Sequence, residues 1–321
     1  MLLYYQLIIK KDLLMKLKNM SKIALITGSR GFVGPYLKRE LEDGGYNVFG
    51  IGYENLKNKN YYCVDITDKD LLRTTIESIK PNYVFHLAGV SSQSLASVNP
   101  ERTYDVNVEG TRNLLEVLSS LRDTKVLIVS SSHVYGKPNN LPVRENHPLN
   151  GESAYAQSRI KQETLVKSFS NKINTIVVRS FNHTGPAQND AFVIPKIISQ
   201  IVDIKNGKRE FLEIGDINIK RDILDVRDVV RAYVMLLEQD KFGVVVNVCR
   251  GKSISLNDVI QYGKKFSGLK DIDIRVNPEF VRQDDVIDIY GDNGQLKKLI
   301  DWSPLINYEK MIEDIYNYWD I

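Results

Sequence analysis

Three glycines, each three residues after the last, follow a short apolar run close to the start of the sequence. The run Ile23 to Thr27 has the composition of a buried strand, and Gly28, Gly31 and Gly34 come directly after it. A helix is predicted from Pro35 to Gly44. In this order Gly28 permits a tight turn, Gly31 lets the backbone approach a phosphate, and Gly34 lets the helix pack closely on the strand. With the free N–H groups of the helix N-terminus, the turn predicts a phosphate cradle for a dinucleotide.

The chain up to about residue 180 alternates short β-branched runs with longer mixed segments. Strands that alternate with helices predict a parallel sheet covered on both faces. Crossovers between parallel strands are right-handed, so the predicted fold class is α/β, a doubly wound Rossmann sheet. The further elements expected are strands at Asn47 to Ile51, Tyr61 to Val64, Tyr83 to Leu87 and Lys125 to Ser130, and helices at Asp68 to Lys80 and Arg102 to Leu121.

Beyond about Arg179 this alternation loosens. Pro, Asn and Gly gather in Asn182 to Asp190 and in Gly215 to Asn218, with helices such as Asp228 to Glu238 in between. The pattern predicts a smaller C-terminal lobe with segments that return to the first domain. We expect an N-terminal extension at residues 1–20, a NAD(P)-binding Rossmann domain at 21–180, and a mainly substrate-binding lobe at 181–321.

The composition is that of an ordinary globular protein, with 43% hydrophobic and 26% charged residues. A net charge of +3 gives no indication of nucleic-acid binding. No apolar run reaches the roughly 18 to 20 residues that span a membrane. Basic residues follow Leu2 to Ile9 rather than precede it, unlike a signal peptide. We expect a cytoplasmic protein, in which residues 1–20 are a silent extension or an amphipathic helix.

Two cysteines, Cys63 and Cys249, lie far apart in strand-like apolar runs. Neither has the spacing of a metal ligand. Both are therefore expected to be buried, reduced thiols, and no metal site is predicted.

Several further segments together match one known family. From Ser21 onward the chain resembles the extended short-chain dehydrogenase/reductase family, which includes NAD-dependent epimerases and dehydratases. The matching segments are Gly28 to Gly34, Asp65, His86 to Gly89, Asn107 to Thr111, Ser130 to Gly136 and Tyr155 to Arg159. The resemblance implies cofactor contacts from Gly28, Arg30, Gly31, Phe32, Val33, Gly34, Asp65, Ile66, Leu87, Ala88, Gly89, Asn107, Tyr155, Arg159 and His183.

The resemblance also implies hydride transfer coupled to proton transfer at a sugar carbonyl or alcohol. Tyr155 aligns with the family's acid/base and Ser131 with the hydroxyl that holds the substrate oxygen. A free tyrosine, with a pKa of about 10, is a poor base at neutral pH, and a fixed cation nearby favours the phenolate. The family places a lysine four residues after the tyrosine, on the same helix face. This chain has Arg159 there, which keeps the charge but has a bulkier planar fork.

The choice between NAD and NADP depends on the end of the second strand, where an acid usually binds the adenine ribose hydroxyls. Gly52 stands at that position, and Arg30 in the glycine turn could reach a 2′-phosphate. These residues favour NADP, whereas Glu54 favours NAD. Asp65 is a candidate acceptor for the adenine amino group, or a helix cap for the next segment.

His133 bears on the reaction. The resemblance implies that sugar-nucleotide 4,6-dehydratases have a carboxylate at this position, beside the catalytic hydroxyl. That carboxylate helps to eliminate water. A histidine there argues against dehydration, unless it is a loop residue with no catalytic part.

The second half is similar to the branch of GDP-4-keto-6-deoxy-mannose reductases and other enzymes of GDP-sugars. The matching runs are Arg179 to Pro186, Phe192-Val193, Gly215-Asp216, Arg221 to Asp228, Asn247 to Cys249 and Arg282 to Val286, with Gln283 where proline is usual. Arginine forks suit a diphosphate. Alternatively, Arg221 and Asp222 form a surface ion pair, and Asp225 to Asp228 is an acidic first turn of a helix. The substrate-binding residues implied are Ser91, His133, Asn182, Val193, Arg221, Arg282 and Asp285.

The expected function is NAD(P)H-dependent reduction of the 4-keto group of a GDP-6-deoxy-hexose. A GDP-mannose 4,6-dehydratase, a GDP-sugar 4-oxidase or epimerase, and a catalytically dead nucleotide-sugar-binding protein remain as alternatives, the last because of Arg159. Relatives are often homodimers through a four-helix bundle, to which Arg102 to Leu121 and Tyr155 to Ser168 would contribute.

Overall fold

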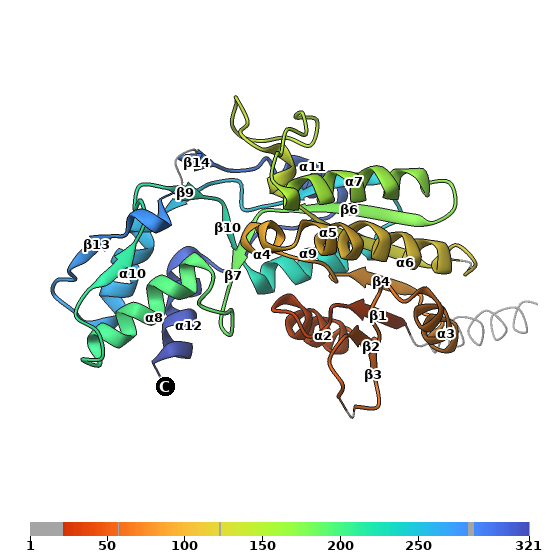
Figure 1. The fold of residues 1–321 in the computed structure, drawn as a ribbon, viewed down its shortest axis with the longest axis horizontal. Coiled ribbons are helices and arrows are strands. Elements are labelled where there is room, and N and C mark those ends of the chain that lie inside the picture. The colour runs from red at the N-terminus through yellow and green to blue at the C-terminus, as the bar shows by residue number, and fades with distance from the viewer. Residues whose placement is uncertain (1–21, 57, 122, 282–285, 321) are drawn as a thin grey trace, which may run out of the picture.

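The computed structural model describes residues 22–56, 58–121, 123–281 and 286–320 (Figure 1). The extension predicted at residues 1–20, the domain start at Ser21, and the substrate-binding candidates Arg282 and Asp285 lie outside the described residues.

A seven-stranded sheet is the centre of the molecule (Figure 1). Every neighbouring pair in it is parallel, in the order β11-β6-β5-β4-β1-β2-β3. The order reverses between β1 and β4, which is the switch point where doubly wound sheets bind dinucleotides. The α/β Rossmann prediction is confirmed. The strands are β1 (Ile23–Thr27), β2 (Asn47–Gly52), β3 (Tyr61–Cys63), β4 (Tyr83–His86), β5 (Lys125–Ser131), β6 (Asn174–Ser180) and β11 (Val244–Val248).

Helices bury their apolar faces against both sides of this sheet. One cluster of buried residues joins the strands to α2 (Val33–Asp43), α9 (Val226–Glu238) and α11 (Gly294–Leu299). A second cluster joins the opposite face to α3 (Lys69–Ile79), α6 (Gly110–Leu118) and α7 (Ala154–Ser168). Because both faces are covered, the strands are apolar almost throughout.

The long helix predicted at Arg102 to Leu121 is interrupted. It consists of α5 (Pro100–Tyr104), a π-helical turn at Asp105–Glu109, and α6. The π turn carries Asn107, whose side chain is fully buried. Such turns insert one extra residue into a helix and are frequent at functional sites. Apolar periodicity alone does not reveal them.

A smaller lobe lies to one side of the sheet (Figure 1). Its core joins α8 (Val193–Lys205), α10 (Leu256–Ser267) and α12 (Tyr308–Trp319). Because α9 and β11 follow the first lobe segments in sequence yet pack in the Rossmann domain, the chain crosses between the two parts more than once. The boundary placed at residue 180 stays a prediction. Short strands complete the lobe: β7 (Asn182–Thr184) with β10 (Ile223–Asp225), β8 (Leu212–Ile214) with β13 (Ile274–Val276), and β9 (Lys220–Arg221) between β12 (Ile254–Ser255) and β14 (Asp288–Ile289).

The two cysteines differ in their surroundings. Cys249 is fully buried, and burial raises the pKa of its thiol well above the usual value. Cys63 is exposed, with its Sγ 3.4 Å from the carbonyl oxygen of Tyr53, so the prediction that both thiols are buried is wrong for Cys63. It ends β3, a strand at the edge of the seven-stranded sheet.

Among the described residues, no helix is long and apolar enough to cross a membrane.

Candidate active site at the carboxyl ends of the strands

The glycine turn between β1 and α2 can be built only from glycine at two of its positions. Gly28 has a φ of +66°, and a Cβ there would lie 2.7 Å from the backbone nitrogen of Ala88. A Cβ on Gly34 would lie 2.2 Å from the carbonyl oxygen of Ser29. The turn therefore brings β1, α2 and the end of β4 into direct backbone contact. Phe32 and Val33 then begin α2, whose first N–H groups have no partner within the helix.

The end of β2 has a tyrosine hydroxyl where an acid would stand in an NAD enzyme. A Cβ on Gly52 would lie 2.6 Å from the hydroxyl oxygen of Tyr61, the first residue of β3. That hydroxyl is buried, the Glu54 backbone N–H interacts with its oxygen, and within the described part of the chain it has no acceptor for its proton. Burial raises the pKa of Tyr61, so the group is a neutral donor. Tyr61 is not among the residues predicted from the sequence, although the glycine facing it was the available signal.

Arg30 extends from the glycine turn toward the same strand end. Its Nε donates a hydrogen bond to Glu54 Oε2 at 3.1 Å, and both side chains are about half exposed. Arg30, which favours NADP, thus pairs with Glu54, which favours NAD. An exposed ion pair of this kind contributes about 1 kcal/mol or less, so an incoming phosphate can replace the carboxylate.

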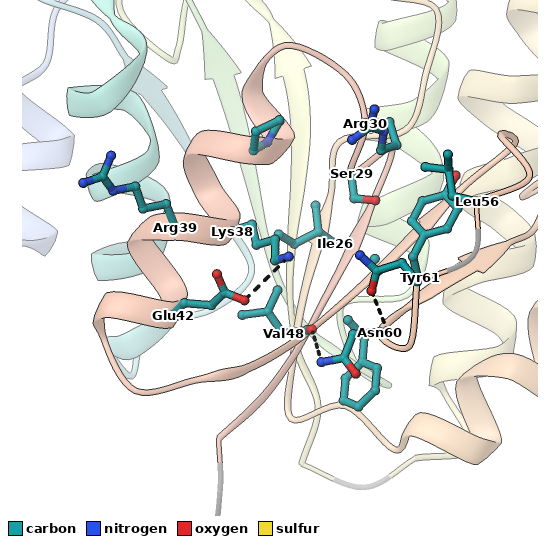
Figure 2. Close-up of a pocket in the computed structure, with 14 residues that line it drawn as sticks. Ile26, Ser29, Arg30, Lys38, Arg39, Glu42, Val48, Leu56, Asn60 and Tyr61 are labelled. Carbon is teal, nitrogen blue, oxygen red and sulfur yellow. Dashed lines mark hydrogen bonds and ion pairs between the residues drawn. The ribbon is translucent and has the colours of Figure 1, made fainter.

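A cavity of about 270 Å³ opens beside Ser29 and Arg30, between α2 and the β2–β3 segment (Figure 2). Lys38 and Arg39 of α2 also line it, and Glu42 lies 3.7 Å from the Lys38 ammonium. Each of these cations has an acidic partner, since Arg30 pairs with Glu54 and Arg39 lies 3.8 Å from Asp43, so this border of the glycine turn is charged but balanced among the described residues.

Asp65 does not cap α3. Its carboxylate accepts hydrogen bonds from the Thr67 backbone N–H at 3.0 Å and from Arg102 Nη2 at 2.6 Å. The cap of α3 is Asp68, which accepts from the Leu71 N–H. The helix-cap interpretation of Asp65 is therefore wrong, and its proposed role at the adenine stays a prediction.

The glycine turn and α2 also contact the lobe, through the rings of Phe32 and Tyr36. Phe32 stacks on His183 of β7, with ring centroids 6.2 Å apart and planes 7° from parallel. The surrounding protein lowers the pKa of His183, so the ring is neutral. Tyr36 of α2 donates its hydroxyl proton to the Pro186 carbonyl oxygen at 2.7 Å. These contacts set the position of β7 relative to the turn.

Ser131, His133 and Tyr155 meet where β5 ends and α7 begins. The Ser131 hydroxyl oxygen accepts a hydrogen bond from the His133 backbone N–H at 3.2 Å, which leaves the hydroxyl proton available to donate. Tyr155 is buried in the first turn of α7, which the Ser153 side chain caps. The His133 ring meets the Tyr155 ring edge-on at 5.7 Å, and Gln93 contacts its Nδ1 at 2.9 Å. Gln93 is not among the residues predicted from the sequence.

Arg159 is buried beneath Tyr155, with its Cζ 5.4 Å from the ring centroid. Its Nη1 donates to the Val129 carbonyl oxygen at 3.1 Å, and its Nη2 donates to the Val90 carbonyl oxygen at 3.2 Å. A Cβ on Gly89 would lie 2.7 Å from Nη2. The fork thus fills the space under the tyrosine and beside the end of β4. Asn107 closes the same corner, accepting from the Val90 N–H and donating to Ser158.

Two buried donors without an acceptor lie beside the residues that follow β4 and end β2. Within the described residues, neither Arg159 Nε, next to Gly89, nor the Tyr61 hydroxyl, next to Gly52, has an acceptor for its proton. Buried donors are normally paired, so each is suited to an acceptor on a bound ligand. A dinucleotide whose pyrophosphate sits at the glycine turn has ribose hydroxyls to offer at both ends. The residues present therefore fit the nicotinamide dinucleotide that the sequence predicts.

The candidate substrate residues lie on separate elements. Ser91 is exposed in the loop between β4 and α4 (Gln93–Val98), Asn182 is exposed at the start of β7, and Val193 is 42% exposed at the start of α8. Arg221 of β9 donates to the Val286 carbonyl oxygen at 2.6 Å.

Asp222 is not part of a surface ion pair with Arg221. It is 1% exposed and accepts from the backbone N–H groups of Arg250, Gly251 and Gly291. Burial raises its pKa to about 6 despite these bonds. Asp225, by contrast, caps α9, as an acidic first turn predicts.

Residues 25–315 match the family model for GDP-mannose 4,6 dehydratase. The chain belongs to this family. It is therefore an enzyme of the short-chain dehydrogenase/reductase type. The GDP-6-deoxy-D-mannose reductase of Pseudomonas aeruginosa is 31% identical over 94% of this chain and 98% of its own length. The GDP-mannose 4,6-dehydratase of Yersinia enterocolitica is 27% identical over 92% of each.

A solved structure of the RMD protein from Pseudomonas aeruginosa in complex with NADPH superposes with a TM-score of 0.84. It is 29% identical and the match covers 94% of this chain and 98% of that one. The family's use of nicotinamide cofactors agrees with the sequence prediction. The family contains both reductases and dehydratases, so membership alone does not fix the reaction.

Proposed function

We propose that this enzyme reduces the 4-keto group of GDP-4-keto-6-deoxy-D-mannose with NADPH or NADH, giving GDP-D-rhamnose or a close isomer. The observation that carries the proposal is His133. It contacts Ser131 and Tyr155, at the position where the resemblance to the dehydratases implies a carboxylate. The reductase from Pseudomonas aeruginosa, which matches nearly end to end, supports the same reaction.

The bound nicotinamide supplies the hydride that adds to C4. Ser131 donates its hydroxyl proton in a hydrogen bond to the C4 oxygen and so fixes the carbonyl. Tyr155 donates its phenolic proton to the same oxygen as the alcohol forms, which is general acid catalysis. Arg159 stays charged throughout and stabilises the phenolate that remains. This placement of the cation under the ring also speaks against a catalytically dead protein.

The GDP-sugar would lie between the sheet and the smaller lobe. Asn182 and Val193 stand at the starts of β7 and α8, on the lobe side of the His183–Phe32 contact. Ser91 and His133 border the sugar from the Rossmann side. Arg221 would bind the diphosphate together with the predicted residue Arg282, and the predicted residue Asp285 would accept hydrogen bonds from the ribose hydroxyls.

NADP is the favoured cofactor. Gly52 offers no acid to the adenine ribose hydroxyls, and Arg30 and the Tyr61 hydroxyl both lie at that strand end. Two donors at this position suit a 2′-phosphate better than a diol. Glu54 is the argument for NAD, and it already pairs with Arg30.

The test is to incubate the protein with GDP-4-keto-6-deoxy-D-mannose and NADPH or NADH, and to follow the absorbance of the reduced cofactor. We expect stoichiometric oxidation of the cofactor and one GDP-6-deoxyhexose product. A parallel reaction contains GDP-mannose without added cofactor. If the ketone is left unreduced while GDP-mannose loses water, the enzyme is a dehydratase. If the GDP-6-deoxyhexose is instead oxidised or epimerised at C4 with no net reduction, the oxidase or epimerase alternative holds.

Two further expectations concern the whole protein. A homodimer would form through the faces of α6 and α7, and the protein would work in the cytoplasm. Sedimentation of the purified chain tests the first, with a mass of twice 36.7 kDa expected.

A further inference from the structure

Three acceptors within the described residues bind the fork of Arg159, and one of them is a side chain. Gln162 lies one turn further along α7 and is fully buried. Its Oε1 accepts from Arg159 Nη1 at 2.9 Å. Because arginine has no acceptor, this contact fixes which end of the amide faces the guanidinium. The Gln162 Nε2 must then face the other way.

The other end of Gln162 meets Thr111 on α6. Gln162 Nε2 donates to the Thr111 hydroxyl oxygen at 2.8 Å, and the Thr111 hydroxyl donates to the Asn107 carbonyl oxygen at 2.7 Å. A hydroxyl has one proton and two lone pairs. The remaining contact of Thr111, with His86 Nε2 at 2.9 Å, must therefore be one in which the histidine donates.

His86 passes this constraint on to β1. Burial, together with the nearby Arg159 charge, lowers its pKa to about 3, so the ring is neutral and carries one proton. With that proton on Nε2, Nδ1 accepts from the Thr27 hydroxyl at 2.7 Å. The Thr27 hydroxyl oxygen in turn accepts from the Ala88 N–H at 3.3 Å. The direction of every bond in the chain is thus determined.

The chain runs from the catalytic cation to the residue before Gly28. It links α7, α6, β4 and β1 through side chains that are all nearly or fully buried: Arg159, Gln162, Thr111, His86 and Thr27. Hydrogen bonds linked in this way have one arrangement, because reversing the direction of any one of them leaves a buried donor or acceptor without a partner.

We propose that Gln162 is the positioning residue that allows an arginine to serve at this site, by holding its fork so that Nε faces the cofactor ribose and the charge stays under Tyr155. Through these hydrogen bonds Gln162 also connects Arg159 to Thr27, the residue before the glycine turn. Residues at both ends of the cofactor would then belong to one hydrogen-bonded network. A lysine has a compact ammonium and lacks the second nitrogen of the fork. It would not require Gln162.

This dependence is tested by a double-mutant cycle of Gln162→Met and Arg159→Lys. Dissociation constants for NADPH and NADH are measured by calorimetry without any sugar substrate, and kcat is measured against pH with the proposed ketone. The cofactor measurement needs no turnover. A failure of the proposed reaction therefore leaves it intact, and the two outcomes are distinguishable.

In the protein with Arg159, we expect Gln162→Met to weaken cofactor binding about tenfold, which is about 1.4 kcal/mol. The kcat–pH profile should move along the pH axis, because the cation no longer sits at a fixed distance from Tyr155. In the Arg159→Lys background the same change should alter the dissociation constant less than threefold. An equal factor in both backgrounds would overturn the proposal, since it would show a merely structural role.

Two controls separate positioning from stability. Gln200 is a buried glutamine of α8 with bonds to Lys196 and Glu213, in the core of the other lobe. Gln200→Met should lower the unfolding temperature without moving the cofactor affinity or the pH profile. If Gln162→Met does not fold, Gln162→Asn takes its place in the same cycle, because its amide is one methylene shorter and cannot reach both Arg159 and Thr111. It should weaken cofactor binding several-fold in the Arg159 protein and less than twofold in the Arg159→Lys background. Equal factors in the two backgrounds would contradict the proposal.

Discussion

The two ends of the proposed cofactor site are built differently. At the proposed adenine end, Arg30 and Glu54 form a half-exposed ion pair. At the nicotinamide end, Arg159 is 4% exposed and each nitrogen of its fork that has a partner is held by a carbonyl or by Gln162. Both ends present an arginine to the ligand. Arg30 can move without leaving a buried group unpaired, whereas Arg159 cannot. We therefore expect the exposed end to tolerate a change of cofactor, and the buried end to fix the geometry of the reaction.

The largest effect is expected at the buried end. Replacing Tyr155 by Phe removes the proton donor and should lower kcat about 10²- to 10⁴-fold, the usual contribution of general acid catalysis. Calorimetry should show cofactor binding within about threefold of the parent, because the ring stays over Arg159. If the variant retains more than a tenth of kcat, the proton donor is another group. Tyr135→Phe is not a suitable control, because the Tyr135 hydroxyl is hydrogen-bonded to Asn247.

The neutral state of His86 gives the buried end a pH dependence. Its pKa is about 3 in the folded protein against 6.5 for the free side chain, so between these values the unfolded state binds more protons. The free energy of unfolding therefore rises with pH across this window, by up to about 1.4 kcal/mol per pH unit, and the contribution is complete above pH 6.5.

Urea unfolding from about pH 4 to 8 measures this, in the parent protein and in His86→Gln, which keeps one donor and one acceptor. The stability of the parent relative to the variant should be constant above about pH 7 and decrease as the pH falls below 6.5. Asp222, whose pKa is raised from 3.8 to about 6, has the opposite slope between these values in both proteins and so cancels in the difference. A difference independent of pH would show that His86 is not buried as a neutral ring.

A smaller effect is expected at the exposed end. Arg30→Ala should raise the KM for NADPH about 10- to 100-fold, since a hydrogen bond to a charged group contributes about 1.5 to 3 kcal/mol. The KM for NADH should change less than threefold, and kcat should not change. Steady-state kinetics with both cofactors measures this. An equal loss for NADH would mean that Arg30 supports the turn rather than reading a 2′-phosphate.

The smallest effect is expected for Glu54. Glu54→Gln frees Arg30 from an exposed ion pair worth at most about 1 kcal/mol, so the KM for NADPH should fall by no more than about fivefold. The gain should shrink as salt is added, because exposed charges are screened. If NADPH binding weakens instead, Glu54 contributes to the site directly, as the case for NAD supposes.

Much of the fold could be predicted from local sequence. The strands and the parallel sheet follow from the period of the apolar residues. The glycine turn follows from positions such as Gly28, whose positive φ favours glycine. Tyr155, Ser131 and Arg159 could be named because motif spacing places them at strand and helix ends. The interrupted helix at Asp105–Glu109 could not, since a π turn keeps the same composition as the helix around it.

The sequence by itself determined the dinucleotide fold and the family, and it predicted the acid/base, because these depend on residues close together along the chain. Only the tertiary structure decided that Tyr61 faces Gly52, that Glu54 pairs with Arg30, and that Gln162, Thr111 and His86 connect Arg159 to Thr27. Those partners are brought together from different elements by packing. A buried hydrogen bond depends on where two elements touch, and no local pattern records that position.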